Sequence, residues 1–204
     1  MSSMSGTVQS MQTIGITASG VLSGGIFTVS LMIPTLTLPA TSSKRTFSSS
    51  YEPGSSVSHI ATQWRHAYNM GKKIAPTVSL ISSATYAYIA HVFRNDTGLM
   101  RTDNVRTSNL YLLAAVLALG PVPFTLIAMH PTNKRLMARA DAAETEGSHA
   151  AAGAEKEKVK KGEVGASKED SEVLGLLEKW VWLSATRACF PLAAAVVALT
   201  ATVA

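Results

Sequence analysis

Long stretches without ionisable side chains are the feature of this chain that most restricts its fold. Asp, Glu, Lys and Arg are absent from four windows, residues 15–43, 74–93, 109–129 and 189–204. A bilayer hydrocarbon core is about 30 Å thick, so a helix that rises about 1.5 Å per residue crosses it with roughly 20 mostly apolar residues. The windows are close to that length. The sequence therefore predicts four transmembrane helices.

The overall composition fits a membrane protein with a polar loop. Of the 204 residues, 47% are hydrophobic and only 15% are charged. Four spans and their connections account for the length, which leaves no room for a second folded domain. The chain carries a net charge of +5 but has no basic face interleaved with aromatic residues, so we expect no nucleic-acid partner. The single cysteine, Cys189, cannot form an internal disulfide.

The predicted fold is all-α, a single membrane-embedded four-helix bundle. We place its spans at about residues 12–38, 74–93, 110–129 and 180–203. The first span contains Gly20 and Gly24, a spacing that favours close helix packing, either inside the bundle or in a homo-oligomer. The third span contains Gly120, Pro121 and Pro123, and these residues predict a kink.

The segments between the spans differ in character. Residues 41–55 are rich in serine and read as a linker. Between Val57 and Gly71, apolar residues recur every three or four positions, which predicts a short amphipathic helix at the membrane interface before span two. Span two then begins with Pro76 in its first turn. Residues 141–172 are mostly Ala, Gly, Glu and Lys, so we expect a disordered or weakly helical charged loop there.

Several short motifs lie at the ends of the predicted spans. They are Gln63-Trp64-Arg65-His66-Ala67-Tyr68 with Gly71 and Pro76, Pro123-Phe124-Thr125 followed by His130-Pro131-Thr132-Asn133 and Leu136, and Trp182-Leu183 with Arg187. Their order on four spans resembles the small DUF1772 membrane proteins of fungi, the anthrone oxygenase-like family. The resemblance covers about residues 55–137 and 176–203. Such proteins carry Asn two residues after the tryptophan of the last span, where this chain has Ser184.

The resemblance implies an enzyme that uses O2 to oxidise an anthrone, a tricyclic aromatic polyketide, to an anthraquinone without flavin or haem. The methylene group of an anthrone loses a proton easily because the resulting enolate is aromatic, and that anion can pass an electron to O2. The protein then needs a base, donors for the enolate oxygen and an apolar pocket for a flat ring. The alternative is a non-catalytic membrane protein that binds or moves an aromatic or lipid ligand.

Candidate residues for this chemistry gather on one side of the membrane in the predicted topology. We expect His130 to be the base because imidazole titrates near neutral pH, and we expect Asn133 and Arg187 to stabilise the enolate oxygen. A second set is expected to bind the substrate: His59, Trp64, Arg65, Tyr68 and Trp182. A purely structural role is the alternative for the aromatic residues and the arginines. Aromatic side chains anchor helices at membrane interfaces, and arginine binds lipid phosphate or snorkels towards it.

A metal site is the alternative to cofactor-free chemistry. His59 and His66 are seven residues apart and share a helix face, and His130 would add a third imidazole. No nearby carboxylate completes a metal-binding pattern, so we expect no metal, with iron as the alternative. The chain also lacks the glycine-rich dinucleotide and phosphate motifs and the nucleophile elbow of hydrolases.

The distribution of Lys and Arg predicts the orientation in the membrane. Residues 41–73 and 131–179 hold fourteen of them, nine close to a span, whereas the opposite side holds three. By the positive-inside rule the two larger loops face the cytosol and both termini face the lumen of the endoplasmic reticulum or another endomembrane.

This orientation can be tested with sealed microsomes. Protease added from outside should cut within residues 141–172 and leave tags at both termini intact, as read by immunoblotting. Protection of that segment together with cleavage of the terminal tags would contradict the orientation.

Overall fold

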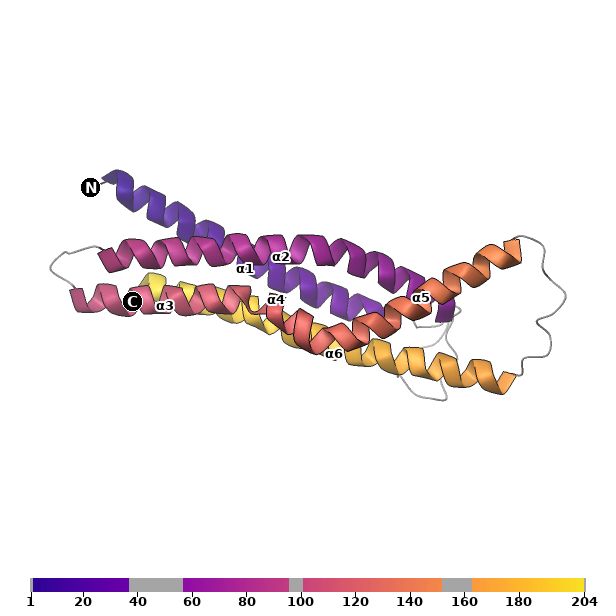
Figure 1. Cartoon of the computed structure of the whole chain (residues 1–204). Helices are drawn as coiled ribbons and strands as arrows, with labels where there is room; N and C mark the ends of the chain where they lie inside the picture. Colours follow the sequence, from indigo (N-terminus) through magenta and orange to yellow (C-terminus); the bar gives the residue numbers. More distant parts are fainter. Residues whose placement is uncertain (1, 37–56, 96–100, 152–162, 204) are drawn as a thin grey trace. The chain divides into compact units, whose positions relative to one another are not determined.

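The computed structural model describes residues 2–36, 57–95, 101–151 and 163–203, and all of these except Gly120 are helical. The helices form four long segments (Figure 1). They are α1 (Ser2–Leu36), α2 (Val57–Asn95), a third segment made of α3 (Arg101–Leu119), α4 (Pro121–Phe124), the π-helix η1 (Thr125–Met129) and α5 (His130–Ala151), and α6 (Glu163–Val203). The predicted all-α fold is confirmed. The predicted linker, residues 41–55, lies outside the described residues.

Three segments are long and apolar enough to cross a bilayer. They are Gly6–Thr35, Asn104–Ala142 and Ser171–Val203. The first, third and fourth predicted spans lie on these segments, except for residues 36–38, of which 37 and 38 are outside the described part. The second predicted span, residues 74–93, lies within α2. Its average hydropathy is too low for it to be among the three, and its crossing of the membrane stays a prediction.

The low average hydropathy of this part of α2 comes from polar side chains that face inwards. Ser79, Ser82 and Thr85 are buried, whereas Leu80 and Ile81 are more than half exposed. A helix among lipids is expected to hide its polar groups and present its apolar ones. The outer face of residues 74–93 therefore fits the predicted span better than the average suggests.

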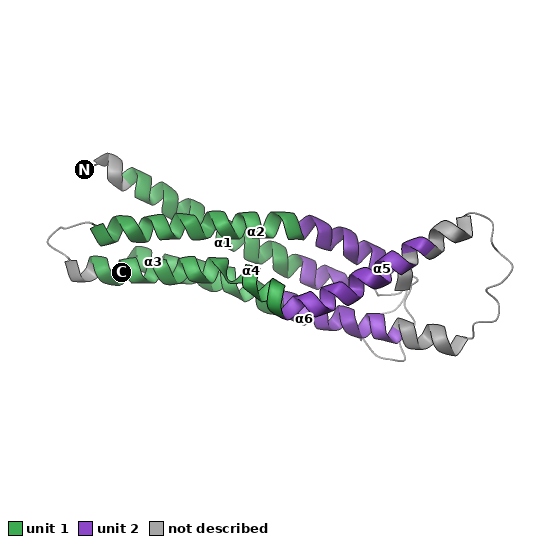
Figure 2. Cartoon of the chain, in the orientation of Figure 1, with its two compact units in different colours: residues 1–28, 72–127, 185–204 green, residues 29–71, 128–184 purple. Residues whose placement is uncertain are grey.

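The chain divides into two compact units (Figure 2). Unit 1 comprises residues 1–28, 72–127 and 185–204, and unit 2 comprises residues 29–71 and 128–184. Helices α1, α2 and α6 each contribute residues to both units.

Unit 1 is held together mainly by small side chains around a few aromatic rings. Its largest buried cluster comprises Tyr86, Ile89, Ala90, Tyr111, Ala114, Ala115, Ala118, Ala194, Ala198 and Ala201. Tyr111 links the helices: its hydroxyl accepts a hydrogen bond from Gln12 Nε2 at 2.9 Å and lies 3.0 Å from the hydroxyl of Thr202. Its ring stacks with Phe93 at a centroid distance of 5.9 Å. Small residues let membrane helices approach closely where no hydrophobic effect drives their association.

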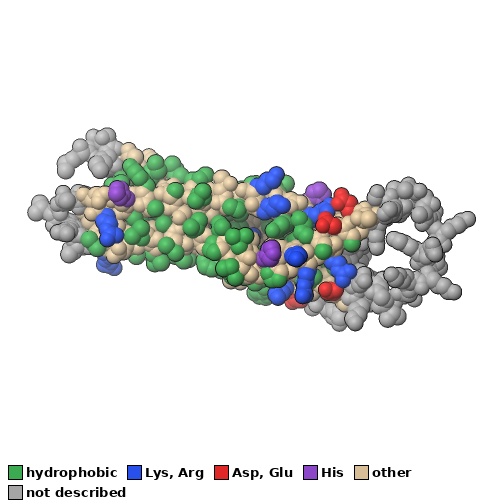
Figure 3. Space-filling model, in the orientation of Figure 1, with side chains coloured by type: hydrophobic (Ala, Val, Ile, Leu, Met, Phe, Trp, Pro, Cys, Tyr) green, Lys and Arg blue, Asp and Glu red, His purple; other side chains and the backbone are tan. Residues whose placement is uncertain are grey.

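The outer surface of unit 1 is the reverse of that of a soluble protein. Large apolar side chains are exposed along it, as the face in Figure 3 illustrates. They include Ile14, Val21, Ile74, Leu80, Ile81, Leu113, Val116, Leu126, Ile127, Val196, Leu199 and Val203. Soluble monomers rarely expose so extended an apolar surface. Unit 1 is therefore built to lie among lipid chains.

The third segment is interrupted where the sequence predicts a kink. Helix α3 ends at Leu119, Gly120 forms a turn, and the short α4 and the π-helix follow. A Cβ on Gly120 would lie 2.7 Å from Cδ1 of Phe190, so the absence of a side chain lets that ring pack against the turn. The Thr125 hydroxyl donates to the Pro121 carbonyl oxygen at 2.7 Å. The predicted kink is confirmed.

The amphipathic stretch after Val57 is helical as predicted, but it is not a separate helix. Helix α2 continues from Val57 to Asn95 through Pro76, which lies mid-helix and not in a first turn. Beside the proline, the Thr77 hydroxyl donates to the Lys73 carbonyl oxygen at 3.0 Å. The apolar stripe of this stretch is buried within unit 2, because Ile60 is 0% exposed. It packs against protein, and its position at the membrane interface stays a prediction.

Helices extend into both ends of the predicted charged loop. Helix α5 continues to Ala151 and α6 begins at Glu163, so only residues 152–162 of the predicted loop lie outside the described helices. Near the two ends of the predicted loop, Arg139 Nη2 donates to Glu172 Oε2 at 2.8 Å. Polar helices without an apolar stripe can be stabilised by such cross-helix charge pairs.

The close approach of α1 in unit 1 occurs at Gly15 and not at the predicted glycine pair. A Cβ on Gly15 would lie 2.7 Å from Cε1 of Tyr86, whereas a Cβ on Gly20 or Gly24 would meet no atom of the described chain within 4 Å. Among the described residues, Gly20 and Gly24 do not pack closely against another helix, so the prediction that they do so inside the bundle is wrong. Their face is exposed, and a role in a homo-oligomer stays a prediction.

We expect Gly15→Ala to destabilise the protein, whereas Gly20→Ala, its matched control on the same helix, should not, because alanine favours a helix and meets no neighbour there. The new methyl group at position 15 would displace the Tyr86 ring, and overpacking of this kind costs about 1–3 kcal/mol. Thermal unfolding in detergent, followed by circular dichroism, measures the difference. Equal melting temperatures for the two variants would show that Gly15 and Tyr86 do not pack as described.

Candidate active site

Three aromatic residues and one amide form a cluster inside unit 2. Trp64 and Tyr68 are one turn apart on α2, a spacing that places side chains on the same helix face, and their rings stack at 5.2 Å with an interplanar angle of 13°. Trp180 of α6 meets Trp64 edge to face at 6.0 Å. Asn133 of α5 completes the group. We call Trp64, Tyr68, Trp180 and Asn133 the aromatic cluster.

Asn133 accepts a hydrogen bond from the N–H of one of the two buried indoles. Trp180 Nε1 donates to Asn133 Oδ1 at 3.0 Å, and both residues are buried. Asn133 faces inwards because it shares the buried face of α5 with Thr132, Leu136 and Ala140. The hydrogen bond ties α5 to α6 in an environment where an unpaired indole N–H would be costly.

The N–H of the other buried indole, that of Trp64, has no such acceptor among the described residues. Trp64 is 0% exposed, and its Nε1 has no hydrogen-bond acceptor among the described residues. Leaving a buried donor without an acceptor costs about 1–3 kcal/mol. Such a group calls for an explanation beyond packing.

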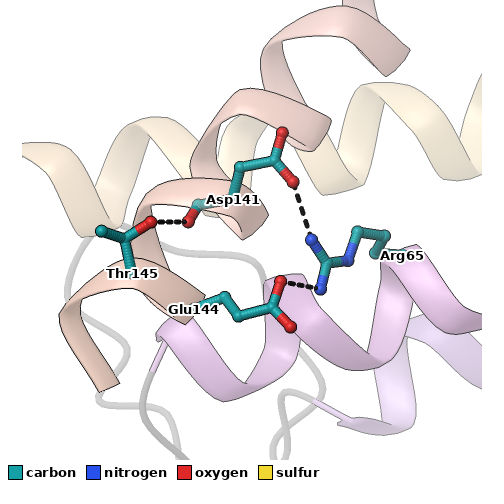
Figure 4. Close-up of polar contacts among 4 residues, drawn as sticks. All are labelled: Arg65, Asp141, Glu144 and Thr145. Carbon is teal, nitrogen blue, oxygen red and sulfur yellow. Dashed lines mark hydrogen bonds and ion pairs between the residues drawn. The ribbon is translucent and has the colours of Figure 1, made fainter. Parts of the chain in front are cut away.

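Arg65, the neighbour of Trp64, forms a two-armed ion pair with α5 (Figure 4). Nη1 donates to Asp141 Oδ1 at 2.7 Å and Nη2 donates to Glu144 Oε2 at 2.5 Å. The hydrogen bond with Glu144 is the largest of the effects that raise the pKa of Arg65 above its ordinary value, and burial opposes it in part. The Thr145 hydroxyl in turn donates to the Asp141 carbonyl at 3.0 Å. Arg65 thus joins α2 to α5, and its predicted contact with the substrate stays a prediction.

The remaining predicted residues of unit 2 lie on its surface. His130 is exposed and follows directly on the π-helix. His59 is also exposed and lies 2.7 Å from Gln63 Nε2, and Trp182 is 70% exposed. Among the described residues, no three His, Cys, Asp or Glu side chains come together in a way that could hold a metal ion. The three imidazoles considered as ligands, His59, His66 and His130, therefore do not form such a group.

Arg187 is half-buried in unit 1 and is held by the interrupted segment. Its Nη1 donates to the hydroxyl of Thr125 in the π-helix at 3.1 Å. The rings of Phe124 and Phe190 lie beside this part of the chain, 5.5 Å apart. Its predicted partnership with the histidine and the asparagine of α5, which belong to unit 2, stays a prediction.

Sequence reasoning missed the partners of two site residues. No spacing rule connects Asn133 with Trp180, which are 47 residues apart in the sequence. Asp141 and Glu144 lay in a stretch that we expected to be solvated and without fixed contacts. The only local signal was the interval of four between Trp64 and Tyr68, which correctly puts their rings on one face.

Comparison with known proteins gives these residues a context. The family profile for anthrone oxygenases matches residues 64–197, from the first residue of the aromatic cluster to near the end of the last helix. The chain belongs to the anthrone oxygenase family. The resemblance in the sequence motifs is thereby confirmed, and the protein is an enzyme of the oxygenase type.

Several fungal relatives within the anthrone oxygenase family match most of the chain. An anthrone oxygenase of Claviceps purpurea is 31% identical over 185 residues, which cover 90% of this chain and 83% of the relative. The anthrone oxygenase AgnL2 of Paecilomyces divaricatus is 27% identical over 92% of each chain. The anthrone oxygenase encC of Aspergillus fumigatus is 32% identical over 72% of this chain and 71% of its own. No solved structure matches the chain.

A double-mutant cycle tests the hydrogen bond inside the aromatic cluster. We expect Asn133→Ala to lower the free energy of unfolding by about 1–3 kcal/mol, because it leaves the buried N–H of Trp180 without an acceptor. In a Trp180→Phe background the same substitution should cost less, with a coupling energy of about 0.5–3 kcal/mol. Chemical unfolding in detergent measures all four proteins. Strictly additive effects would argue against this bond.

Proposed function

We propose that this protein oxidises an anthrone to the corresponding anthraquinone with O2 at an endomembrane, without flavin or haem. The observation that carries the proposal is family membership: the profile match spans two thirds of the chain and includes the aromatic cluster, His130 and Arg187. Relatives that align over most of their length are named anthrone oxygenases. An apolar outer surface on unit 1 suits an enzyme whose flat, lipophilic substrate partitions into the bilayer.

The proposed reaction consumes one O2 and releases one water. A base removes a proton from the methylene carbon, and the electron pair of the broken C–H bond moves into the ring system to give the enolate. The enolate passes one electron to O2, and the resulting radical combines with superoxide to form a C–O bond. Protonation gives the hydroperoxide. Loss of the second methylene proton breaks the O–O bond, forms the second carbonyl and releases water.

His130 is the proposed base. It is exposed at the junction of the π-helix and α5, where a substrate held in the bilayer or at its surface can reach it. Imidazole is suited to accept a proton near neutral pH. The methylene proton would move to the ring nitrogen in the first step and return to the hydroperoxide anion afterwards.

Asn133 and Arg187 are the proposed donors to the enolate oxygen. The Oδ1 of Asn133 is occupied by the indole of Trp180, so the amide Nδ2–H is the group of this residue that can donate to a substrate. The guanidinium of Arg187 carries a fixed charge and a planar set of N–H donors, one of which bonds the Thr125 hydroxyl. Donors that bind the enolate more strongly than the ketone lower the barrier to proton removal.

The proposal is tested with purified protein in detergent or lipid nanodiscs. An oxygen electrode and absorption spectroscopy should record one O2 consumed per anthraquinone formed from emodin anthrone, above the rate of spontaneous oxidation without protein. EDTA and o-phenanthroline should leave the rate unchanged. Absence of turnover would overturn the proposed activity, whereas loss on chelation with recovery on added Fe²⁺ would overturn the cofactor-free mechanism.

We expect His130→Ala to lower kcat by roughly 10²- to 10⁴-fold, the usual contribution of a general base. The defect should shrink as the pH rises, because hydroxide increasingly replaces the missing imidazole. His91→Ala is the control: His91 is also exposed, but it lies near the end of α2 and contacts Asn95. A pH–rate profile for both variants measures the effect, and a defect that does not depend on pH would speak against His130 as the base.

A further inference from the structure

The two buried tryptophans of the aromatic cluster differ in one respect. The Trp180 N–H has an acceptor in Asn133, whereas the Trp64 N–H has none among the described residues. Both side chains are almost completely buried, and their rings touch edge to face. The difference therefore lies at the single atom Nε1 of Trp64.

Packing alone does not account for an indole at this position. The stack on Tyr68 and the edge contact with Trp180 are interactions that a phenylalanine ring also makes. Phenylalanine would carry no N–H, and so no unsatisfied donor. The extra group that tryptophan brings has a physical cost in the ligand-free protein and acquires a benefit only when an acceptor arrives.

The surroundings would make a hydrogen bond from this atom strong. The interior of unit 2 contains Ile60, Leu136 and Leu177, all completely buried. In such an environment of low dielectric constant, a donor that is already desolvated interacts strongly with an oxygen that becomes negatively charged. An enolate oxygen is an acceptor of this kind.

We propose that Trp64 Nε1–H donates a hydrogen bond to the anthrone oxygen that becomes the enolate oxygen. This inference rests on the proposed function and names an atom that recognises its substrate. During the first step the methylene proton goes to the base and the electron pair moves towards the oxygen, while the indole keeps its proton. The hydrogen bond strengthens as charge develops, so it favours the transition state over the bound ketone.

The proposal also fixes how the substrate lies against the indole. An indole N–H points along the ring plane, so the oxygen must lie near that plane, about 3 Å from Nε1. Tyr68 already covers one face of the Trp64 ring. The substrate oxygen therefore approaches the edge of the indole. Because Nε1 is buried in the free protein, binding must open a path to it, and Tyr68 is the aromatic residue of the cluster that is only half-buried.

Trp64→Phe tests the donor while keeping an aromatic ring. We expect kcat/KM for emodin anthrone to fall by about 10- to 100-fold, the effect of losing one hydrogen bond to a charged group. The kinetic isotope effect with anthrone deuterated at the methylene carbon should increase, because proton removal becomes slower relative to the other steps. Trp180→Phe is the matched control: it should lower the melting temperature more than Trp64→Phe does, and lower kcat/KM less. Wild-type kcat/KM and isotope effect in Trp64→Phe would overturn the proposal.

A measurement on the unaltered protein covers the case in which Trp64→Phe does not fold. The chain has three tryptophans, and each contributes one indole N–H signal to a ¹⁵N-resolved NMR spectrum in detergent. Added emodin, the product-type quinone, should move the Trp64 signal downfield and leave the Trp180 signal in place, with Trp180→Phe and Trp182→Phe fixing the assignment. A Trp64 signal that does not respond to saturating emodin would overturn the proposal even if the enzyme oxidises anthrones. Absence of turnover in the wild type would remove the proposed function and this inference together.

Discussion

Lipid cannot accept or donate a hydrogen bond, and this constraint explains most of unit 1. A polar group that enters the bilayer can form hydrogen bonds only within the protein. Ser23 accordingly donates to the backbone carbonyl of Ala188 at 2.9 Å, and Ser108 to that of Ala90 at 2.8 Å. The Tyr86 hydroxyl pairs with Ser19 at 3.2 Å. These bonds join different helices, so polar groups that would be costly among lipids become the contacts that hold the helices together.

Unit 2 is organised by other forces. Its contacts combine broad aromatic surfaces with ion pairs between helices, such as that of Arg65 with Asp141 and Glu144. Exposed ion pairs contribute little stability one by one, but a guanidinium that engages two carboxylates fixes an orientation. The position of Trp64 follows from this, because Arg65 is its direct neighbour on α2. A donor aimed at a substrate oxygen needs such a fixed helix behind it.

Sequence patterns predicted the elements of the fold better than their partners. Uncharged windows located three segments that are apolar enough to cross a bilayer, and the Gly120-Pro121 pair located the interruption of the third. The same reasoning divided α2 at Pro76, because a proline usually marks a helix boundary; the helix nevertheless continues through it. The pairing of Asn133 with Trp180 could not be predicted, since it depends on how α5 and α6 are rotated against each other. The fixed contacts at the ends of the charged loop could not be predicted because they are ion pairs, which leave no apolar periodicity.

The π-helix at Thr125–Met129 has a consequence for how this family can vary. A π-helical turn holds about one residue more than an α-helical turn, so it absorbs the extra residue while the helix after it keeps its phase. Removing one residue there would close the turn as an ordinary α-helical turn and leave the faces that follow nearly unchanged. Removing one residue from α5 ahead of Thr132 would instead rotate the rest of the helix by about 100° relative to the residues before the deletion. Thr132 and Asn133 would then leave the buried face. The π-helix is thus the place in this segment that can lose one residue, whereas α5 should vary by substitution.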